Sequence, residues 1–379
     1  MKKEIDIYKF LEEKTLYFNK INIDTVFEAW QYLKPFAKPK YVIHLIGTNG
    51  KGSTGRILAT YLQKLGKKVL HYSSPHIMEF RERIWIDGKD SSNEVLQEAH
   101  QKLLEILPNK LIDNLSYFEY TTLLALLLSD EKDFLVLEAG LGGEYDATNV
   151  IKADLSLLTT IDYDHMEFLG SSIESIVTTK VNSVDKALIV AKQIHDEVYD
   201  IAKSVVEDKN QKFFKIDDFP IARKNYTIFT QEFLNTNLQT VLAALEYMDI
   251  EIDLEIFKDI IIVGRCQKIA ANITIDVGHN PLGAKVLAKE FANQKVILLY
   301  NTLKDKDYKT VLKTLKPIIE YVLIIPIDDV RALSLEVLQQ TLKELDIKYE
   351  IFSSLPKEKE ILVFGSFKVV EEFLKIYQR

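Results

Sequence analysis

An apolar run at residues 41–46 leads directly into a glycine-rich loop, and a helical pattern follows. The run is short and rich in β-branched side chains, which is typical of a buried strand. Apolar residues then recur at helical spacing over 53–65, until Gly66 ends the pattern. A second short apolar run at 69–72 completes a strand, loop, helix, strand unit. This order predicts an α/β fold with a parallel sheet.

The loop between this strand and this helix has the composition of a phosphate-binding loop. Its residues are Gly47, Thr48, Asn49, Gly50, Lys51, Gly52, Ser53 and Thr54. Backbone N–H groups at a helix N-terminus bind phosphate oxygens, and Lys51 would neutralise phosphate charge. Gly47 precedes Gly50 by fewer positions than in the standard P-loop. We therefore predict a P-loop-type ATPase domain with a shortened loop; an ordinary glycine-rich turn is the alternative.

Candidate metal ligands follow two further apolar runs. In α/β sheets, ligands collect at the carboxyl ends of the strands. Glu138 directly follows the run 134–137, which predicts a magnesium ligand, and a solvated edge carboxylate is the alternative. His165 follows the run 155–161, where a packed or capping histidine is the alternative. Both residues are expected at the same edge of the predicted sheet.

The alternation of strands and helices restarts after Arg265. Apolar runs occur at 273–277, 296–300, 321–325 and 361–364, with helical patterns between them. Because single domains usually stop growing well below 379 residues, we predict two domains. The first is expected over residues 1–262, and the second, a smaller Rossmann-like α/β domain, over 268–379.

Composition argues against several classes of partner. The formal net charge of -8 opposes attraction to nucleic acid and to anionic membranes. The single cysteine, Cys266, cannot form an internal disulfide, which fits a reducing compartment. The apolar run at 123–128 is much shorter than a membrane span. We expect a cytoplasmic protein that binds neither nucleic acid nor a membrane.

A series of short motifs in a fixed order extends over most of the chain. Besides the loop at 47–54, it comprises SSPH at 73–76 with ERI at 82–84, YFEY at 117–120, LEAGLGG at 137–143 with DATN at 146–149, DH at 164–165 with LG at 169–170, DVGHNP at 276–281 and GSF at 365–367. This series resembles the folylpolyglutamate synthase family of the Mur ligase superfamily. The resemblance implies a Mur ligase-like fold with an ATP- and pterin-binding first domain and a glutamate-ligase second domain.

The resemblance also implies the catalytic and metal-binding residues. Thr48 to Lys51 would hold the ATP phosphates, and Ser74, Glu138 and His165 would bind magnesium. A second magnesium ion would be held by Lys180 after its amine has taken up carbon dioxide to form a carbamate. The residues that flank Lys180 depart from the family pattern, and a plain surface lysine is the alternative. Lys51, His165 and Lys180 are the expected catalytic residues.

Substrate contacts are implied at three further groups of residues. The nucleotide base, phosphates and ribose would be met by Asn237, Arg265 and Asp276 respectively; a helix N-cap is the alternative for Asn237. His279 and Ser366 would lie on the glutamate side. The pterin would contact Tyr117, Phe118, Glu119, Tyr145, Asp146 and Ala147, although aromatic side chains are also common in protein cores.

The implied activity is an ATP-dependent ligation that joins L-glutamate to dihydropteroate or to a reduced folate through an acyl phosphate. A monomer is expected from the family. Whether the chain makes dihydrofolate, extends polyglutamates or does both is left open. Two other functions also remain open: a superfamily ligase that acts on a cell-wall precursor, and a nucleotide-binding module without ligation chemistry.

Overall fold

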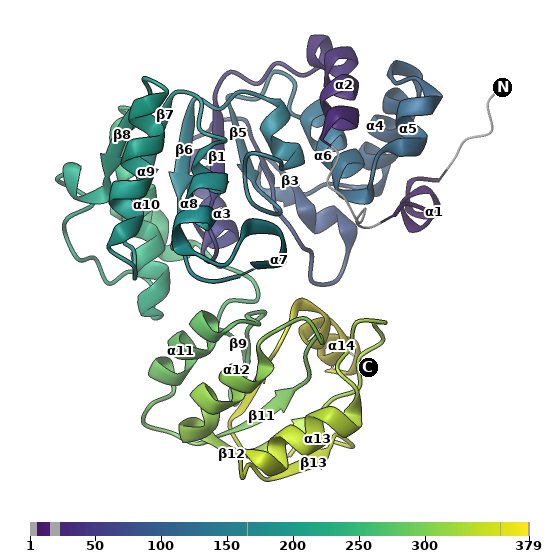
Figure 1. Cartoon of the computed structure of the whole chain (residues 1–379), viewed down its shortest axis with the longest axis vertical. Helices are drawn as coiled ribbons and strands as arrows, with labels where there is room; N and C mark the ends of the chain where they lie inside the picture. The colour runs from purple at the N-terminus through teal and green to yellow at the C-terminus, as the bar shows by residue number, and fades with distance from the viewer. Residues whose placement is uncertain (1–5, 16–22, 165, 357, 378–379) are drawn as a thin grey trace. The chain divides into compact units, whose positions relative to one another are not determined.

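The computed structural model describes residues 6–15, 23–164, 166–356 and 358–377. The chain divides into two compact units. The first unit comprises residues 1–229 and 234–260, and the second comprises residues 230–233 and 261–379. Each unit is built around its own sheet, which is coloured purple to teal in the first unit and green to yellow in the second (Figure 1).

Eight strands of the described residues form the sheet of the first unit, in the order β4-β3-β2-β5-β1-β6-β7-β8. Their bounds are β1 Val42–Ile46, β2 Val69–Tyr72, β3 Ile84–Ile86, β4 Lys89–Asp90, β5 Phe134–Glu138, β6 Leu155–Leu158, β7 Ala187–Val190 and β8 Lys212–Lys215. The pairs from β2 through β8 are parallel, whereas β3 and β4 extend one edge in antiparallel fashion. The parallel sheet predicted from the apolar runs is confirmed.

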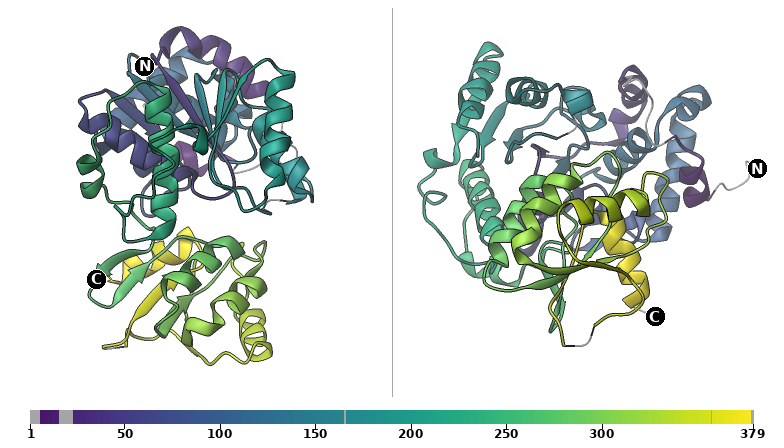
Figure 2. Two further views of the ribbon diagram at one scale, coloured as in Figure 1. Left: turned by 90° about the vertical axis from the view of Figure 1, so that its left-hand side faces the viewer. Right: turned by 60° about the horizontal axis from the view of Figure 1, so that its bottom comes forward.

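Helices lie on both faces of this sheet (Figures 1 and 2). The α-helices of the first unit are α1 Ile7–Glu12, α2 Asp24–Leu33, α3 Lys51–Lys64, α4 Asn93–Ile106, α5 Asn109–Asn114, α6 Tyr117–Leu128, α7 Met166–Leu169, α8 Ile173–Val181 and α9 Glu197–Asp208; α10 Glu232–Tyr247 begins in the second unit and continues in the first. Short 3₁₀ helices are η1 Lys34–Phe36, η2 Phe80–Arg83, η3 Ala147–Val150, η4 Ile216–Asp218 and η5 Leu254–Asp259. Helix α3 packs on the face that carries Leu45 and His71, while α2, α4 and α6 share a core with Leu70 and Tyr72 of the opposite face.

The second unit repeats the same layered plan at a smaller size. Its sheet has the order β13-β12-β11-β14-β10-β9, and within the described residues every pair but β10–β9 is parallel. The strands are β9 Gln267–Ala270, β10 Ile273–Ile275, β11 Val296–Tyr300, β12 Ile319–Ile324, β13 Tyr349–Ile351 and β14 Ile361–Phe364; the helices are α11 Pro281–Glu290, α12 Tyr308–Leu315, η6 Lys316–Ile318, α13 Leu335–Glu344 and α14 Phe367–Tyr377. Apolar side chains of α11, α12 and α13 form one core with the strands. No helix in the described part of the chain has the length and apolarity needed to cross a membrane.

Candidate active site

The glycine-rich loop connects the end of β1 to the first turn of α3. Gly50 is the N-cap of α3 with φ +92°, and no side chain caps this helix start. A Cβ atom on Gly47 would lie 2.0 Å from Thr159 Oγ1, so a side chain cannot be accommodated there. The amides of Thr48 and Asn49 both donate to Thr160 O, at 3.0 and 3.1 Å, which fixes the loop to the end of β6. An uncapped helix start of this kind can bind an anion through its N–H groups.

Two lysine side chains meet at one carbonyl group of this loop. Lys51 Nζ donates to Gly47 O at 3.0 Å and to Thr48 O at 3.2 Å. Lys180 Nζ, from α8, also donates to Gly47 O at 3.0 Å. Burial, together with the nearby charge of Lys51, lowers the pKa of Lys180 to about 7. The structure therefore brings two predicted catalytic lysines together, and it makes one of them easy to deprotonate at neutral pH.

Glu138 ends β5 and lies against the first turn of α3. Its Oε2 accepts a hydrogen bond from the Ser74 amide at 3.1 Å, and a Cβ atom on Gly52 would lie 3.2 Å from the same oxygen. Ser74 and Glu138 are therefore in contact with each other beside the glycine-rich loop. Two ligands of one metal ion need such proximity. His165 lies outside the residues that the structure describes. Across those residues, no group of three or more His, Cys, Asp and Glu side chains could hold a metal ion.

The LEAGLGG loop is held in place by the carboxylate of Asp146. Its Oδ2 accepts from the Leu141 amide at 2.7 Å, and its Oδ1 accepts from the amide and the hydroxyl of Thr148 at 2.9 and 2.6 Å. Asp146 is buried, which raises its pKa, while these hydrogen bonds oppose the shift. The neighbouring Ala147 is also buried, whereas Tyr145 is exposed. Among the predicted pterin contacts of this stretch, Tyr145 therefore presents the most surface.

The YFEY motif begins α6, and its first three side chains have different surroundings. The Phe118 ring packs on Gly140, where a Cβ atom would lie 2.6 Å from the ring. Tyr117 lines a pocket of about 270 Å³ with Tyr8, Leu11, Glu12, Lys14 and Phe80. Glu119 accepts hydrogen bonds from the amide and the hydroxyl of Ser116, which completes a capping box. Glu119 thus stabilises the start of α6. A contact with the pterin, as predicted, would have to be made by the same carboxylate.

Asn237 lies beside the glycine-rich loop. Its Oδ1 is 3.0 Å from the position of a Cβ atom on Gly50. Helix α10 begins at Glu232, so Asn237 lies inside the helix and the N-cap alternative is wrong. The structure therefore places this predicted nucleotide contact next to the loop.

Three of the predicted residues of the second unit follow the adjacent strands β10 and β14, and the fourth, Arg265, precedes β9. Asp276 accepts hydrogen bonds from the amides of Cys266 and Gly278, at 2.8 and 2.7 Å. Burial raises the pKa of Asp276, and the charge of Arg265 opposes the shift. The Arg265 guanidinium lies 5.6 Å from the centre of the Phe367 ring. Two further residues belong to this edge: His279 follows β10, and Ser366 follows β14 and accepts from the Val369 amide in the first turn of α14.

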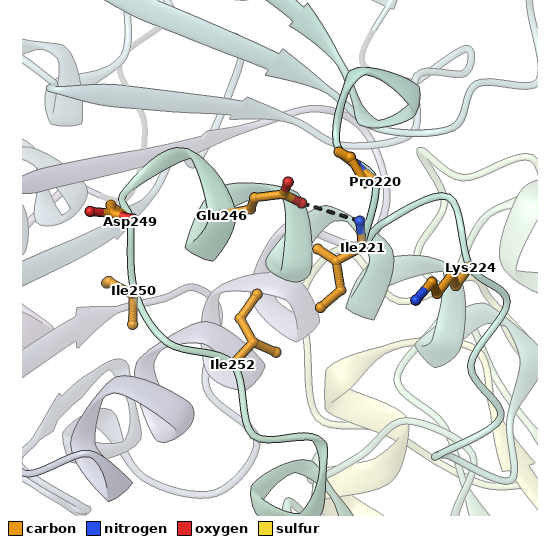
Figure 3. Close-up of a pocket in the computed structure, with 7 residues that line it drawn as sticks. All are labelled: Pro220, Ile221, Lys224, Glu246, Asp249, Ile250 and Ile252. Carbon is orange, nitrogen blue, oxygen red and sulfur yellow. Dashed lines mark hydrogen bonds between the residues drawn. The ribbon is translucent and has the colours of Figure 1, made fainter.

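A pocket of about 440 Å³ lies elsewhere in the first unit (Figure 3). It is lined by Pro220, Ile221, Lys224, Glu246, Asp249, Ile250 and Ile252, none of which is a predicted site residue. The carboxylate of Glu246 accepts a hydrogen bond from the Ile221 amide at 3.2 Å. The lining thus combines aliphatic side chains with Lys224, Asp249 and a Glu246 carboxylate that is already bonded, and it does not change the assignment of the site.

Known proteins resemble the chain over nearly its full length. The model of the Mur ligase middle domain matches residues 46–257. Dihydrofolate synthase/folylpolyglutamate synthase from Haemophilus influenzae is 31% identical, and the match covers 94% of this chain and 92% of the relative. The chain belongs to the dihydrofolate synthase/folylpolyglutamate synthase family. The crystal structure of Helicobacter pylori folylpolyglutamate synthetase shares 38% identity and a TM-score of 0.76, covering 98% of each chain. Escherichia coli FolC in complex with DHPP and ADP shares 26% identity and a TM-score of 0.84, covering 98% of this chain and 96% of the other.

Within this family fold, residues that are far apart in sequence meet at the glycine-rich loop. Lys180 reaches Gly47 across 133 positions, and Ser74 reaches Glu138 across 64. One buried residue beside these groups was not indicated by the sequence. His44, in the middle of β1, contacts Thr148. It lies within an apolar run, where nothing in the local pattern distinguishes it from a core residue.

Proposed function

We propose that this family member is an ATP-dependent ligase that joins L-glutamate to dihydropteroate and also extends the glutamate tail of reduced folates. The convergence of Lys51 and Lys180 on Gly47, at the uncapped start of α3, carries the proposal. The Lys51 cation and a helix N-terminus at one point suit the concentrated negative charge of a triphosphate. The names of the relatives include both ligase activities, which supports assigning both to the chain.

The phosphates would be bound mainly by the helix start. The amides of Thr48 and Asn49 are already bonded to Thr160 O, so the amides from Gly50 onward are the better phosphate donors. Asn237, beside Gly50, is our candidate for the contact with the nucleotide base. In the second unit, Arg265 and Asp276 are our candidates for phosphate and ribose contacts, and His279 and Ser366 are our candidates for glutamate contacts.

The donor set beside the loop suits a magnesium ion. The Glu138 carboxylate and the Ser74 hydroxyl supply hard oxygen ligands, which magnesium prefers. A bound ion would offset negative charge on the phosphoryl group during its transfer. The neutral amine of Lys180 can react with carbon dioxide, forming an N–C bond and releasing one proton, to give a carbamate anion for a second ion. The pKa of about 7 supports this reaction at neutral pH.

Ligation needs an activated carboxylate, because a carboxylate does not react with an amine at neutral pH. A carboxylate oxygen of the acceptor attacks the γ-phosphorus of ATP, and ADP leaves. The amine of L-glutamate then attacks the acyl phosphate carbon; phosphate leaves and the amine loses a proton as the amide forms. Lys51 offsets charge on the transferring phosphoryl group, which is the main contribution a side chain can make to such a step.

The proposal is tested by incubating the purified chain with ATP, magnesium and L-glutamate. One reaction contains dihydropteroate and another contains a reduced monoglutamyl folate, and ADP release and product mass are followed in both. Turnover in both reactions is expected. Turnover in one reaction would assign a single activity, and no glutamate-dependent ADP release in either would refute the proposal.

Two controls separate the other functions. Consumption of a uridine-nucleotide peptide precursor with ATP would identify a cell-wall ligase. ATP binding without glutamate dependence, with every acceptor tried, would identify a nucleotide-binding module.

A further inference from the structure

A directed chain of hydrogen bonds runs from the middle of β1 to Asp146. His44 Nε2 lies 2.8 Å from Thr148 Oγ1, and the Thr148 hydroxyl donates to Asp146 Oδ1 at 2.6 Å. A hydroxyl has one proton to donate. Because that proton is directed to Asp146, Thr148 Oγ1 must accept from His44, and the imidazole proton resides on Nε2. The order of donors is therefore His44, Thr148, Asp146.

All three members of the chain are buried. The exposed fractions of His44, Thr148 and Asp146 are 2%, 1% and 3%. Burial lowers the pKa of His44 to about 4, so the ring is neutral near pH 7 and acts as a fixed donor. Hydrogen bonds in such surroundings polarise one another, and removing His44 takes away the donor that keeps the Thr148 proton directed at Asp146. The orientation of the Thr148 hydroxyl, and through it the Asp146 carboxylate, thus depends on His44.

We propose that His44 is a positioning residue for the acceptor substrate, acting through Thr148 to hold the Asp146 carboxylate in its binding orientation. The inference rests on the proposed function, in which Asp146 contacts the acceptor. The opposite oxygen of Asp146 is held by the Leu141 amide at 2.7 Å, so both ends of the carboxylate are fixed. His44 controls the end that Thr148 reaches.

Four variants test this role in the full-length protein. His44→Leu removes the donor, His44→Gln keeps an N–H donor of similar reach, Thr148→Val removes the link, and the fourth combines H44L with T148V. The matched control is Ser156→Ala. Ser156 is the register partner of His44 on β6 and is equally buried, and its hydroxyl has no hydrogen-bond partner among the residues described.

Steady-state kinetics with dihydropteroate and with ATP give the readout. H44L and T148V should raise KM for the acceptor about tenfold, with KM for ATP unchanged. H44Q should recover most of the loss, and S156A should resemble the wild type. The double variant should be no worse than T148V, because His44 acts only through Thr148.

Several outcomes would overturn the inference. They are an unchanged acceptor KM in H44L, equal losses in acceptor and ATP affinity, and additive losses in the double variant. If H44L does not fold, H44Q and T148V still test the proposal. A wild-type acceptor KM in T148V would contradict the proposed link through Thr148. Failure of the proposed function is recognised separately, because the wild-type protein would then show no glutamate-dependent ADP release.

Discussion

Replacing Lys180 by methionine should make the first unit more stable at neutral pH. Burial lowers the pKa of Lys180 from 10.5 to about 7. Between these two pH values the folded protein holds fewer protons than the unfolded chain, so unfolding takes up a proton and wild-type stability rises with pH. Integrated over that window, the ionisable amine lowers the free energy of unfolding by about 4 kcal/mol at pH 7 and by about 1 kcal/mol at pH 9.5. Methionine has a similar length and carries no charge, so it avoids this cost.

The assay is urea unfolding followed by tryptophan fluorescence in buffer free of carbon dioxide. Trp30 and Trp85 are the two tryptophans of the chain, and both lie in the first unit, so the signal reports on that unit. K180M should exceed the wild type by a margin that shrinks as the pH rises from 7 to 9.5. Lys203→Met, at a half-exposed position of α9, should show no such margin. A K180M variant that is no more stable than the wild type at pH 7, or a margin independent of pH, would refute the reasoning.

Three further perturbations have defined outcomes. Gly140→Ala puts a methyl group 2.6 Å from the Phe118 ring, so it should lower the free energy of urea unfolding by about 1–3 kcal/mol. Initial rates should show a raised KM for the acceptor and an unchanged KM for ATP. His71→Leu removes a buried imidazole whose two nitrogens lack partners among the described residues, and it should raise stability by about 1 kcal/mol in urea unfolding. Because burial lowers the pKa of His71, wild-type stability is lost as pH falls below 6.5. The stability difference between H71L and the wild type should therefore grow below this pH. An equal difference at pH 8 and pH 5 would contradict this. Glu138→Gln should raise the magnesium concentration needed for half-maximal ADP release about 10- to 100-fold, and unchanged magnesium dependence would remove Glu138 from the metal site.

Most of the parallel strands were predictable because each lies in a mainly apolar run, although β1, β2 and β6 contain His44, His71 and Ser156. The short antiparallel strands β3, β4 and β9 were not, since two to four residues cannot show a clear alternation. The partly exposed β8 has the sequence KFFK, which does not resemble a buried strand. Their pairing is set by neighbouring strands rather than by their own sequence.

The start of α6 could have been found from the sequence. A capping box requires Ser or Thr followed three residues later by Glu or Gln, and Ser116 and Glu119 meet that rule. Without it, Glu119 is considered solely as a substrate contact. In the structure the helix starts at Tyr117, directly after Ser116.

The candidate site was predictable in part. The glycine-rich loop and Glu138 follow from local patterns at strand ends. Lys180 and Ser74 were indicated by the resemblance, because their meeting with the loop depends on tertiary packing across many residues. His44 gave no signal for the same reason, since its partner Thr148 is 104 residues away.

Under the proposed function, the glycine cap of α3 links the stability of the fold to nucleotide supply. A helix start without a side-chain cap gains partners when an anion binds, and that gain stabilises the folded state alone. At a nucleotide concentration 100 times the dissociation constant, the gain is about 2.7 kcal/mol. The population that opens to proteases then falls by about the same factor of 100. Cells short of ATP would therefore lose the enzyme through degradation as well as through lack of substrate.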